Sequence, residues 1–155
     1  MNVTPLFKKL NFKQHKEILI LNSPTEFEAE LKAMQDCTKI KTDIKSISNI
    51  EFVLAFIKTQ PEIDKIAPLI DKKLNGDGIV WFAYPKGTSK KYKTEINRDK
   101  GWDILGKADF ETVRQVAIDD DWSALRFRKV EFIKTMNRRT DFAMTKGGKT
   151  KTASH

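Results

Sequence analysis

GIVWFAYPK, residues 78–86, is an apolar run that ends abruptly in a tyrosine–proline pair followed by a lysine. A continuous apolar run of this length, bounded by Gly and Pro, is typical of a strand that is covered on both faces. Asn75 and Gly76 lie just before the run, separated from it by Asp77, and are typical of a helix end. The sequence therefore predicts a helix, then a buried strand, then a lysine-rich loop.

Strand and helix patterns alternate along the rest of the chain. The predicted strands are residues 17–22, 38–44, 50–58, 78–84, 112–119 and 123–132. The predicted helices are residues 23–34, 59–74 and 95–108. Pro68 conflicts with a straight second helix, because proline removes one backbone hydrogen bond.

This alternation indicates right-handed crossover connections and a largely parallel sheet with helices on both faces. The two last strands are separated only by a short polar turn, so we expect them to form an antiparallel hairpin. The predicted fold is α/β: a three-layer Rossmann-like sandwich, mostly parallel, with an antiparallel C-terminal hairpin. Residues 8–133 are predicted to form this one domain.

Composition separates the folded part from the C-terminal segment. The chain has 155 residues, 39% hydrophobic and 32% charged, and a net charge of +8. Residues 134–155 carry six basic residues and one acidic residue and are rich in Gly, Thr and Lys, so we expect a basic, disordered tail. With one cysteine, no signal-peptide pattern and no run long enough to span a bilayer, the sequence predicts a cytoplasmic protein without a membrane partner.

The loop after the 78–84 strand is the first candidate site. Ligands of open α/β sheets bind beyond the carboxyl ends of the strands. Lys86 follows the strand directly, and Thr88 and Ser89 lie beside it, so ammonium and hydroxyl groups are available to bind a phosphate or a carboxylate. The alternative is a solvated lysine-rich loop that only aids solubility.

The segment DDDWSALRFR, residues 119–128, is the second candidate. Three adjacent carboxylates need a cation or a partner, but no His or Glu completes a metal set, so we predict no metal site. We expect an aspartate to serve the turn and another to pair with Arg126, Arg128 or Arg98. Trp122 is interpreted as a packing anchor, with a stacking platform as the alternative.

Catalytic machinery is scarce in this sequence. Cys37 has no histidine near it in the sequence, and His15 and His155 form no ligand pair or triad. The glycine-containing segments do not have the spacing of phosphate loops. We therefore predict no catalytic residue and no cofactor, and leave open whether the protein is an enzyme.

The order of elements resembles an abbreviated Rossmann-type methyltransferase domain. Methyltransferases that bind S-adenosylmethionine carry a Gly-rich turn after the first strand and an acidic residue at the end of the second. Here the first turn is Asn22-Ser23-Pro24, without glycine, and Asp43 is the candidate for the acidic residue. The resemblance implies the fold, whereas the first turn lacks the glycine that the cofactor pocket of this superfamily uses.

The chain also resembles a set of small bacterial proteins that form a domain family of unknown function. The shared motifs are D-G-x-x-W-x-x-Y-P-K, then N/T-R-D, then D-x-x-W-S-x-L-R-F, beginning here at Asp77, Asn97 and Asp119. The resemblance implies a shared fold and a shared surface. The predicted ligand-binding residues are Lys86, Ser89, Arg98, Trp122, Ser123 and Arg126.

Three functions remain open at this point. The first is a non-enzymatic Rossmann-like domain that binds a small anionic ligand or partner at the strand-end loops. The second is a divergent S-adenosylmethionine-dependent methyltransferase. The third is a nucleic-acid accessory protein that binds weakly through its basic tail, with affinity that falls steeply as salt rises. The oligomeric state stays open.

Overall fold

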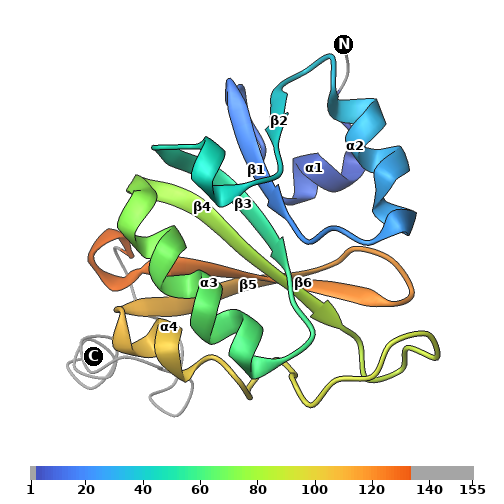
Figure 1. Ribbon diagram of the computed structural model, residues 1–155, viewed down its shortest axis with the longest axis vertical. Helices are drawn as coiled ribbons and strands as arrows, with labels where there is room; N and C mark the ends of the chain where they lie inside the picture. Colours follow the sequence, from blue (N-terminus) through green and yellow to red (C-terminus); the bar gives the residue numbers. More distant parts are fainter. Residues whose placement is uncertain (1–2, 134–155) are drawn as a thin grey trace.

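The computed structural model describes residues 3–133, which form one sheet between two layers of helices (Figure 1). The strands are β1 (Glu17–Leu21), β2 (Lys39–Lys41), β3 (Ile50–Phe56), β4 (Leu74–Pro85), β5 (Phe110–Ala117) and β6 (Trp122–Lys129). The α-helices are α1 (Pro5–Lys9), α2 (Glu28–Met34), α3 (Gln60–Lys73) and α4 (Asp103–Lys107). The 3-10 helices are η1 (Thr25–Phe27), η2 (Ile44–Ser46) and η3 (Val130–Phe132).

The sheet has the strand order β2-β1-β3-β4-β6-β5. The first four strands pair in parallel, whereas β6 is antiparallel to both of its neighbours. The predicted α/β class, the mostly parallel sheet and the antiparallel closing hairpin are confirmed. As a result, β4 and β5 end at the same edge of the sheet at which β6 begins, and the candidate site lies at this edge.

Each face of the sheet has its own core. Val53, Phe82 and Phe127 belong to the core beneath α3 and α4. Phe52 and Trp81 belong to the core beneath α1 and α2, on the other side (Figure 1). Because both faces are covered, the central strands are apolar at successive positions rather than at alternate ones.

Helix α3 begins with a capping box and continues past a proline. Thr59 accepts a hydrogen bond from the Glu62 amide, and the Glu62 carboxylate accepts one from the Thr59 amide, which satisfies two free N–H groups of the first turn. Pro68 lies inside the helix with an exposed side chain, so its missing amide faces solvent rather than the core.

The predicted third helix is wrong over its first half. Residues 95–102 form turns, and only Asp103–Lys107 are helical. Gly101 has a φ of 108° and is followed by the helix, and the Asn97 side chain accepts a hydrogen bond from the Asp99 amide at 2.8 Å. Both features stabilise turns instead of a continuous helix.

Helix α1 was not among the predicted elements. Thr4 caps it by accepting a hydrogen bond from the Phe7 amide, and Pro5 occupies its first position. The carbonyl oxygen of Leu10, just after the helix, accepts a 2.8 Å hydrogen bond from the Trp81 indole. This contact fixes the N-terminal segment over the middle of β4.

Strand β4 begins four residues earlier than predicted, at Leu74. Gly76 has a φ of 54°, and the β3–β4 pairing changes register between Ile50 and Phe52. A Cβ atom at Gly78 would lie 2.9 Å from the Ile50 carbonyl oxygen, so only glycine fits this close approach of two strands.

Residues 134–155, the predicted disordered tail, lie outside the described residues, so the domain boundary and the tail stay predictions. No helix within residues 3–133 combines the length and apolarity that a membrane span requires.

Candidate functional site

The loop after β4 meets the turn between β5 and β6 at the carboxyl edge of the sheet. The Lys86 amide donates to the Asp121 carbonyl oxygen at 2.8 Å, and the Ser89 amide donates to the Lys86 carbonyl oxygen at 3.0 Å. The Ser89 hydroxyl also donates to the Asp121 carboxylate at 2.8 Å. These contacts fold residues 86–89 into a turn and hold it against the hairpin.

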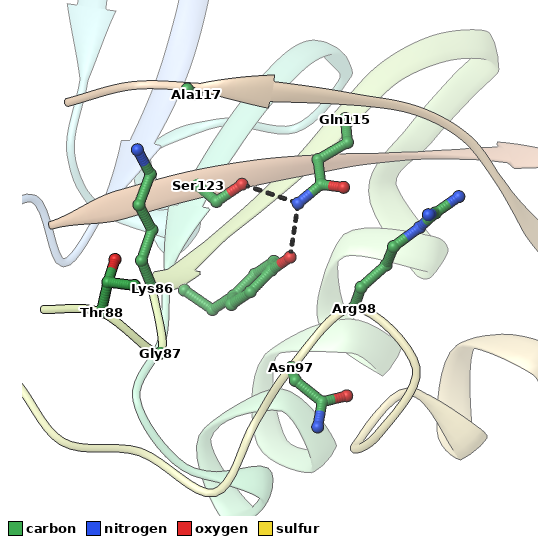
Figure 2. Close-up of a pocket in the computed structure, with 9 residues that line it drawn as sticks. Lys86, Gly87, Thr88, Asn97, Arg98, Gln115, Ala117 and Ser123 are labelled. Atoms are coloured by element: carbon green, nitrogen blue, oxygen red, sulfur yellow. Dashed lines mark hydrogen bonds between the residues drawn. The ribbon is translucent and has the colours of Figure 1, made fainter. Parts of the chain in front are cut away.

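An open cavity of about 600 Å³ lies beside this turn, on the α3/α4 face of the sheet (Figure 2). Three parts of the chain form it: the ends of the strands β4, β5 and β6, the 86–88 turn and the 97–98 turn. The lining residues are Tyr84, Lys86, Gly87, Thr88, Asn97, Arg98, Gln115, Ala117 and Ser123. We call it the strand-end cavity.

The base of the strand-end cavity is a hydrogen-bonded group of three side chains from three adjacent strands. Gln115 Nε2 donates to Tyr84 Oη at 2.9 Å and to Ser123 Oγ at 3.0 Å. Each hydroxyl oxygen therefore already accepts a hydrogen bond, which leaves its proton available for donation. Burial raises the pKa of Tyr84 above its usual 10.0, so the phenol stays protonated and acts as a donor.

Two cationic side chains stand on opposite sides of this base, Lys86 on one side and Arg98 on the other (Figure 2). Neither side chain makes a hydrogen bond or an ion pair within residues 3–133. Arg98 belongs to a turn that is closed by the backbone bridge between Asn97 and Lys100. The buried indole of Trp102 donates to the Asn97 carbonyl oxygen at 2.8 Å and holds this turn in place.

Among residues 3–133, no Asp or Glu lines the strand-end cavity. Its lining offers an ammonium group, a guanidinium group, hydroxyls and amides, and most of these are hydrogen-bond donors. A cavity of this composition is suited to a carboxylate or a phosphate, because charge-assisted hydrogen bonds to oxyanions are the strongest that such groups form.

The structure brings three of the six predicted ligand-binding residues together in this cavity: Lys86, Arg98 and Ser123. Ser89 lies next to them, but its hydroxyl contacts Asp121. Trp122 and Arg126 lie on the opposite face of β6, because side chains alternate along a strand. The assignment of all six to ligand binding stays a prediction.

Trp122 packs as an anchor in the core. Its side chain is 1% exposed, and its ring lies 5.1 Å from Phe56 and 5.0 Å from Tyr92. Asp119 serves the turn, since its carboxylate accepts hydrogen bonds from the Asp121 and Trp122 amides at 2.8 Å. Within residues 3–133 no three His, Cys, Asp or Glu side chains gather as a metal-ligand set.

The expected pairing of these aspartates with an arginine is wrong. Arg128 instead forms a two-pronged contact with Asp77, at 2.9 Å from Nε and 2.6 Å from Nη2. Asp77 lies in β4, so the carboxylate that pairs with Arg128 comes from the neighbouring strand and not from the turn at residues 119–121. Asp121 is held by Ser89 rather than by a cation.

Gln115 was not predicted as a site residue. A register shift in the β5–β6 pairing between Thr112 and Arg114 decides which β5 residues face the cavity. Without this bulge, Arg114 and Val116 would face the cavity in place of Gln115. No sequence signal marks the bulge, because Val113, the extra residue, is a common strand residue.

A second part of the same edge lies beyond β1 and β3. The chain leaves β1 toward β2 on one side and then crosses to β3 on the other, so this is the topological switch point where such sheets bind ligands. Here Glu26, in η1, accepts hydrogen bonds from Tyr92 Oη at 2.8 Å, Lys91 Nζ at 3.0 Å and Trp122 Nε1 at 3.3 Å. We call these four residues the Glu26 cluster.

The Glu26 cluster attaches the loop after β4 to the end of β1. Lys58, just after β3, places its Nζ 4.8 Å from the centre of the Tyr92 ring. Burial raises the pKa of Glu26, but the hydrogen bonds from Tyr92, Lys91 and Trp122 outweigh this effect and lower it from 4.5 to about 2. The carboxylate is therefore ionised throughout the neutral range.

The switch point has one feature of an S-adenosylmethionine site and lacks others. Asn22, in the turn after β1, has a φ of 57°, the left-handed conformation that glycine usually occupies. Asp43, after β2, uses its carboxylate to cap η2 by accepting from the Lys45 amide at 2.9 Å. Because Tyr92 crosses this edge to Glu26, the residues do not fit the cofactor in this arrangement.

No known protein-family model matches this chain, and no curated protein matches it. Among solved structures, it is similar to the fibrillarin pre-rRNA processing protein of Methanococcus jannaschii, with a TM-score of 0.50 and 11% identity over 76% of this chain and 67% of that one. It is also similar to a putative type 11 methyltransferase from Sulfolobus solfataricus, with a TM-score of 0.46 and 10% identity over 80% and 90% of the two chains. For the N-methyltransferase NodS from Bradyrhizobium japonicum the TM-score is 0.45, with 17% identity over 74% of each chain.

Identities this low show a shared fold and nothing more. The Rossmann-like fold that the order of elements predicted is confirmed by the strand order of the sheet and by the similarity to the fibrillarin protein. The resemblance to the small bacterial family stays a prediction.

Proposed function

We propose that this protein binds a small anionic ligand in the strand-end cavity. The observation that carries the proposal is the position of Lys86 and Arg98, which have no partner within residues 3–133, on either side of a hydroxyl-lined base. The ligand would carry a carboxylate or phosphate group that accepts hydrogen bonds from Tyr84 and Ser123 and lies between the two cations.

Binding, rather than catalysis, is the activity that this arrangement supports. General acid–base or nucleophilic catalysis needs a group whose pKa lies near neutral pH, or a nucleophile beside a base. The raised pKa of Tyr84 moves the phenol away from that range. The hydroxyl of Ser123 contacts an amide, Gln115, rather than a histidine or a carboxylate.

Thermal shift with nucleotides, polyphosphates and acidic metabolites tests this function. We expect at least one class to raise the unfolding temperature, and we expect Lys86→Ala and Arg98→Ala each to weaken binding by about tenfold or more. Lys90→Ala is the matched control, because Lys90 belongs to the same loop but does not line the cavity. No response in wild type, or equal responses in all three variants, would refute the proposal.

A divergent S-adenosylmethionine-dependent methyltransferase is the second candidate. The left-handed backbone of Asn22 favours it, since this residue supplies the turn conformation for which the fold normally uses glycine. Binding would require Tyr92 and Lys91 to leave Glu26.

Calorimetry with S-adenosylmethionine decides between the two candidates. The comparison is wild type against Glu26→Gln, which weakens the contact that keeps the loop over the switch point. Affinity tighter than millimolar in either protein supports the second candidate. Weaker binding in both removes it and leaves the strand-end cavity unaffected.

A further inference from the structure

The other face of the β5–β6 hairpin carries three arginines: Arg114, Arg126 and Arg128. Arg126 is the cross-strand partner of Trp81, whose side chain lies in the core beneath α1 and α2. Arg126 therefore lies on the face opposite to Ser123 and the strand-end cavity. Arg114 is directly opposite Arg126 in the β5–β6 register, so two guanidinium groups extend from neighbouring positions of one face.

These arginines differ in how their charge is compensated. Arg128 is paired with Asp77 at 2.6 Å. Arg126 and Arg114 have no hydrogen bond or ion pair within residues 3–133, and Arg126 Nε is buried without a hydrogen-bond partner. Glu111, the other carboxylate in this register, lies opposite Arg128 rather than beside Arg126.

This arrangement is costly for the protein alone. Like charges directly opposite on neighbouring strands destabilise a sheet. A buried N–H donor without a partner adds the free energy of its desolvation. Burial and the nearby Arg128 and Arg114 lower the pKa of Arg126, and the Asp77 carboxylate offsets this only in part. An anion between Arg114 and Arg126 would remove both costs.

A phosphate group fits this position better than a carboxylate does. Two guanidinium groups offer planar sets of donors, and a tetrahedral phosphate has enough oxygens to accept from both at once. The Nε of Arg126 is the donor that still lacks an acceptor.

We propose that Arg114 and Arg126 bind a phosphate group on this face of the hairpin, at a site separate from the strand-end cavity. Free phosphate compounds and the backbone of a nucleic acid share this chemistry. Asp77 holds Arg128 out of the site and moderates its positive charge.

Side-chain NMR of the arginine Nε–Hε groups in the full chain tests the proposal. The signal of Arg126 is assigned by its loss in Arg126→Lys. Inorganic phosphate is titrated against chloride of equal ionic strength, and a single-stranded oligonucleotide is the second probe. We expect the Arg126 signal to shift saturably, and Arg114→Gln to weaken binding by about tenfold or more.

Two further variants make the test specific. Asp77→Asn should tighten phosphate binding, because it releases Arg128 and lets a third guanidinium group contact the phosphate. Arg98→Gln is the control in the strand-end cavity and should leave the Arg126 titration unchanged. In phosphate-free buffer, Arg114→Gln should raise the unfolding temperature, because it removes a like-charge pair while its side chain is exposed.

Each outcome bears on the proposal. Saturation with inorganic phosphate identifies a small phosphate ligand, and saturation with the oligonucleotide alone identifies a nucleic-acid backbone; both support the site. An Arg126 signal that moves with neither probe overturns it. So does an affinity that is equal in Arg114→Gln and wild type, or one that is lost in Arg98→Gln.

Discussion

Gln115 is the residue on which the base of the strand-end cavity depends. Its Nε2 group donates to both Tyr84 and Ser123, so a single amide sets the direction of two hydroxyl groups. If the amide is replaced by an acceptor, the hydroxyl protons turn toward the new acceptor and no longer point into the cavity. The charge and hydrogen-bonding direction at position 115 should therefore control ligand binding.

Gln115→Glu tests this role directly. The new carboxylate accepts from both hydroxyls and repels an incoming anion, so we expect anion affinity to fall by more than tenfold while the free energy of unfolding changes by less than about 1 kcal/mol. Gln115→Met is the matched control, since it keeps the length of the side chain without charge and should lose less affinity. Ligand titration followed by thermal shift measures both. Equal affinities for Gln115→Glu and wild type would contradict the arrangement described.

Glu26 gives the protein a predictable sensitivity to acid. Its pKa in the folded state is about 2, below the 4.5 of a free glutamate, so the unfolded chain binds more protons between these two values. The stabilisation by the ionised carboxylate is complete above about pH 4.5 and is lost as the pH falls toward 2.

Glu26→Gln should remove this part of the pH dependence. Urea unfolding of wild type and variant, measured between neutral pH and pH 3, should give free energies that differ most at neutral pH and converge in acid. Glu28→Gln, an exposed glutamate in α2, is the control and should leave the wild-type pH profile intact. A constant difference between wild type and Glu26→Gln at all pH values would show that Glu26 acts without its charge.

Single residues show how far the sequence determines the site. Lys86 was singled out because it follows a buried strand, and Ser123 and Arg98 because of the predicted resemblance to a small bacterial family; all three line the strand-end cavity. Alternation along β6 already places Arg126 on the face opposite to Ser123. Gln115 was not identifiable, since its face depends on the register of β5 against β6. A one-residue bulge reverses the faces of a strand, and its position is a property of the assembled hairpin.

Among the elements, those with one continuous local signal were predicted. β3 and β4 are buried on both faces, and their apolar runs are visible without knowledge of their neighbours. The 95–108 segment is different: Ile96 and Trp102 are both buried, but they are carried by turns that the large indole of Trp102 holds in place. Tertiary packing of one aromatic side chain thus replaced the first half of a predicted helix.

Helix α3 provides a prediction at the scale of an element. Pro68 interrupts the hydrogen bonding of a helix that nevertheless continues to Lys73, and its exposed ring contributes no core packing. Pro68→Ala should therefore raise the free energy of unfolding by about 1–2 kcal/mol. The restored helix hydrogen bonding raises this free energy, and the greater conformational freedom of the unfolded variant reduces the gain. Pro61→Ala is the control: Pro61 lies in the first turn, where no amide is required, so no gain is expected. Urea denaturation measures both, and equal gains would show that the position inside the helix is irrelevant.

At the scale of the whole molecule, the antiparallel hairpin creates two different surfaces. The face covered by α3 and α4 opens into the strand-end cavity at its edge, with Lys86 and Arg98. The opposite face carries Arg114 and Arg126. Alternation along β6 sends Ser123 to one surface and Arg126 to the other, so one strand serves both.

The overall charge of +8 raises the question of which cations would contact a nucleic acid. The logarithm of the binding constant for a single-stranded nucleic acid falls linearly with the logarithm of the salt concentration. The slope is about −0.7 for each phosphate that the protein neutralises. Replacement of Lys146, Lys149 and Lys151 by Gln keeps the length of the chain and removes three charges from residues 134–155. If these lysines contact an oligonucleotide, the slope should become shallower by about 2, because three contacts are lost.

The Arg114–Arg126 site makes the opposite prediction for the same triple variant. A phosphate held by two guanidinium groups depends on local geometry, so the shift of the Arg126 Nε–Hε signal should persist at low salt when the three lysines are absent. Arg114→Gln should instead abolish most of this shift while it lowers the slope by about 0.7. Fluorescence anisotropy over a salt series, combined with the NMR titration, separates the two contributions. An unchanged slope in the triple variant would exclude a role of these lysines in nucleic-acid binding, and loss of the Arg126 shift in that variant would show that the hairpin does not bind phosphate by itself.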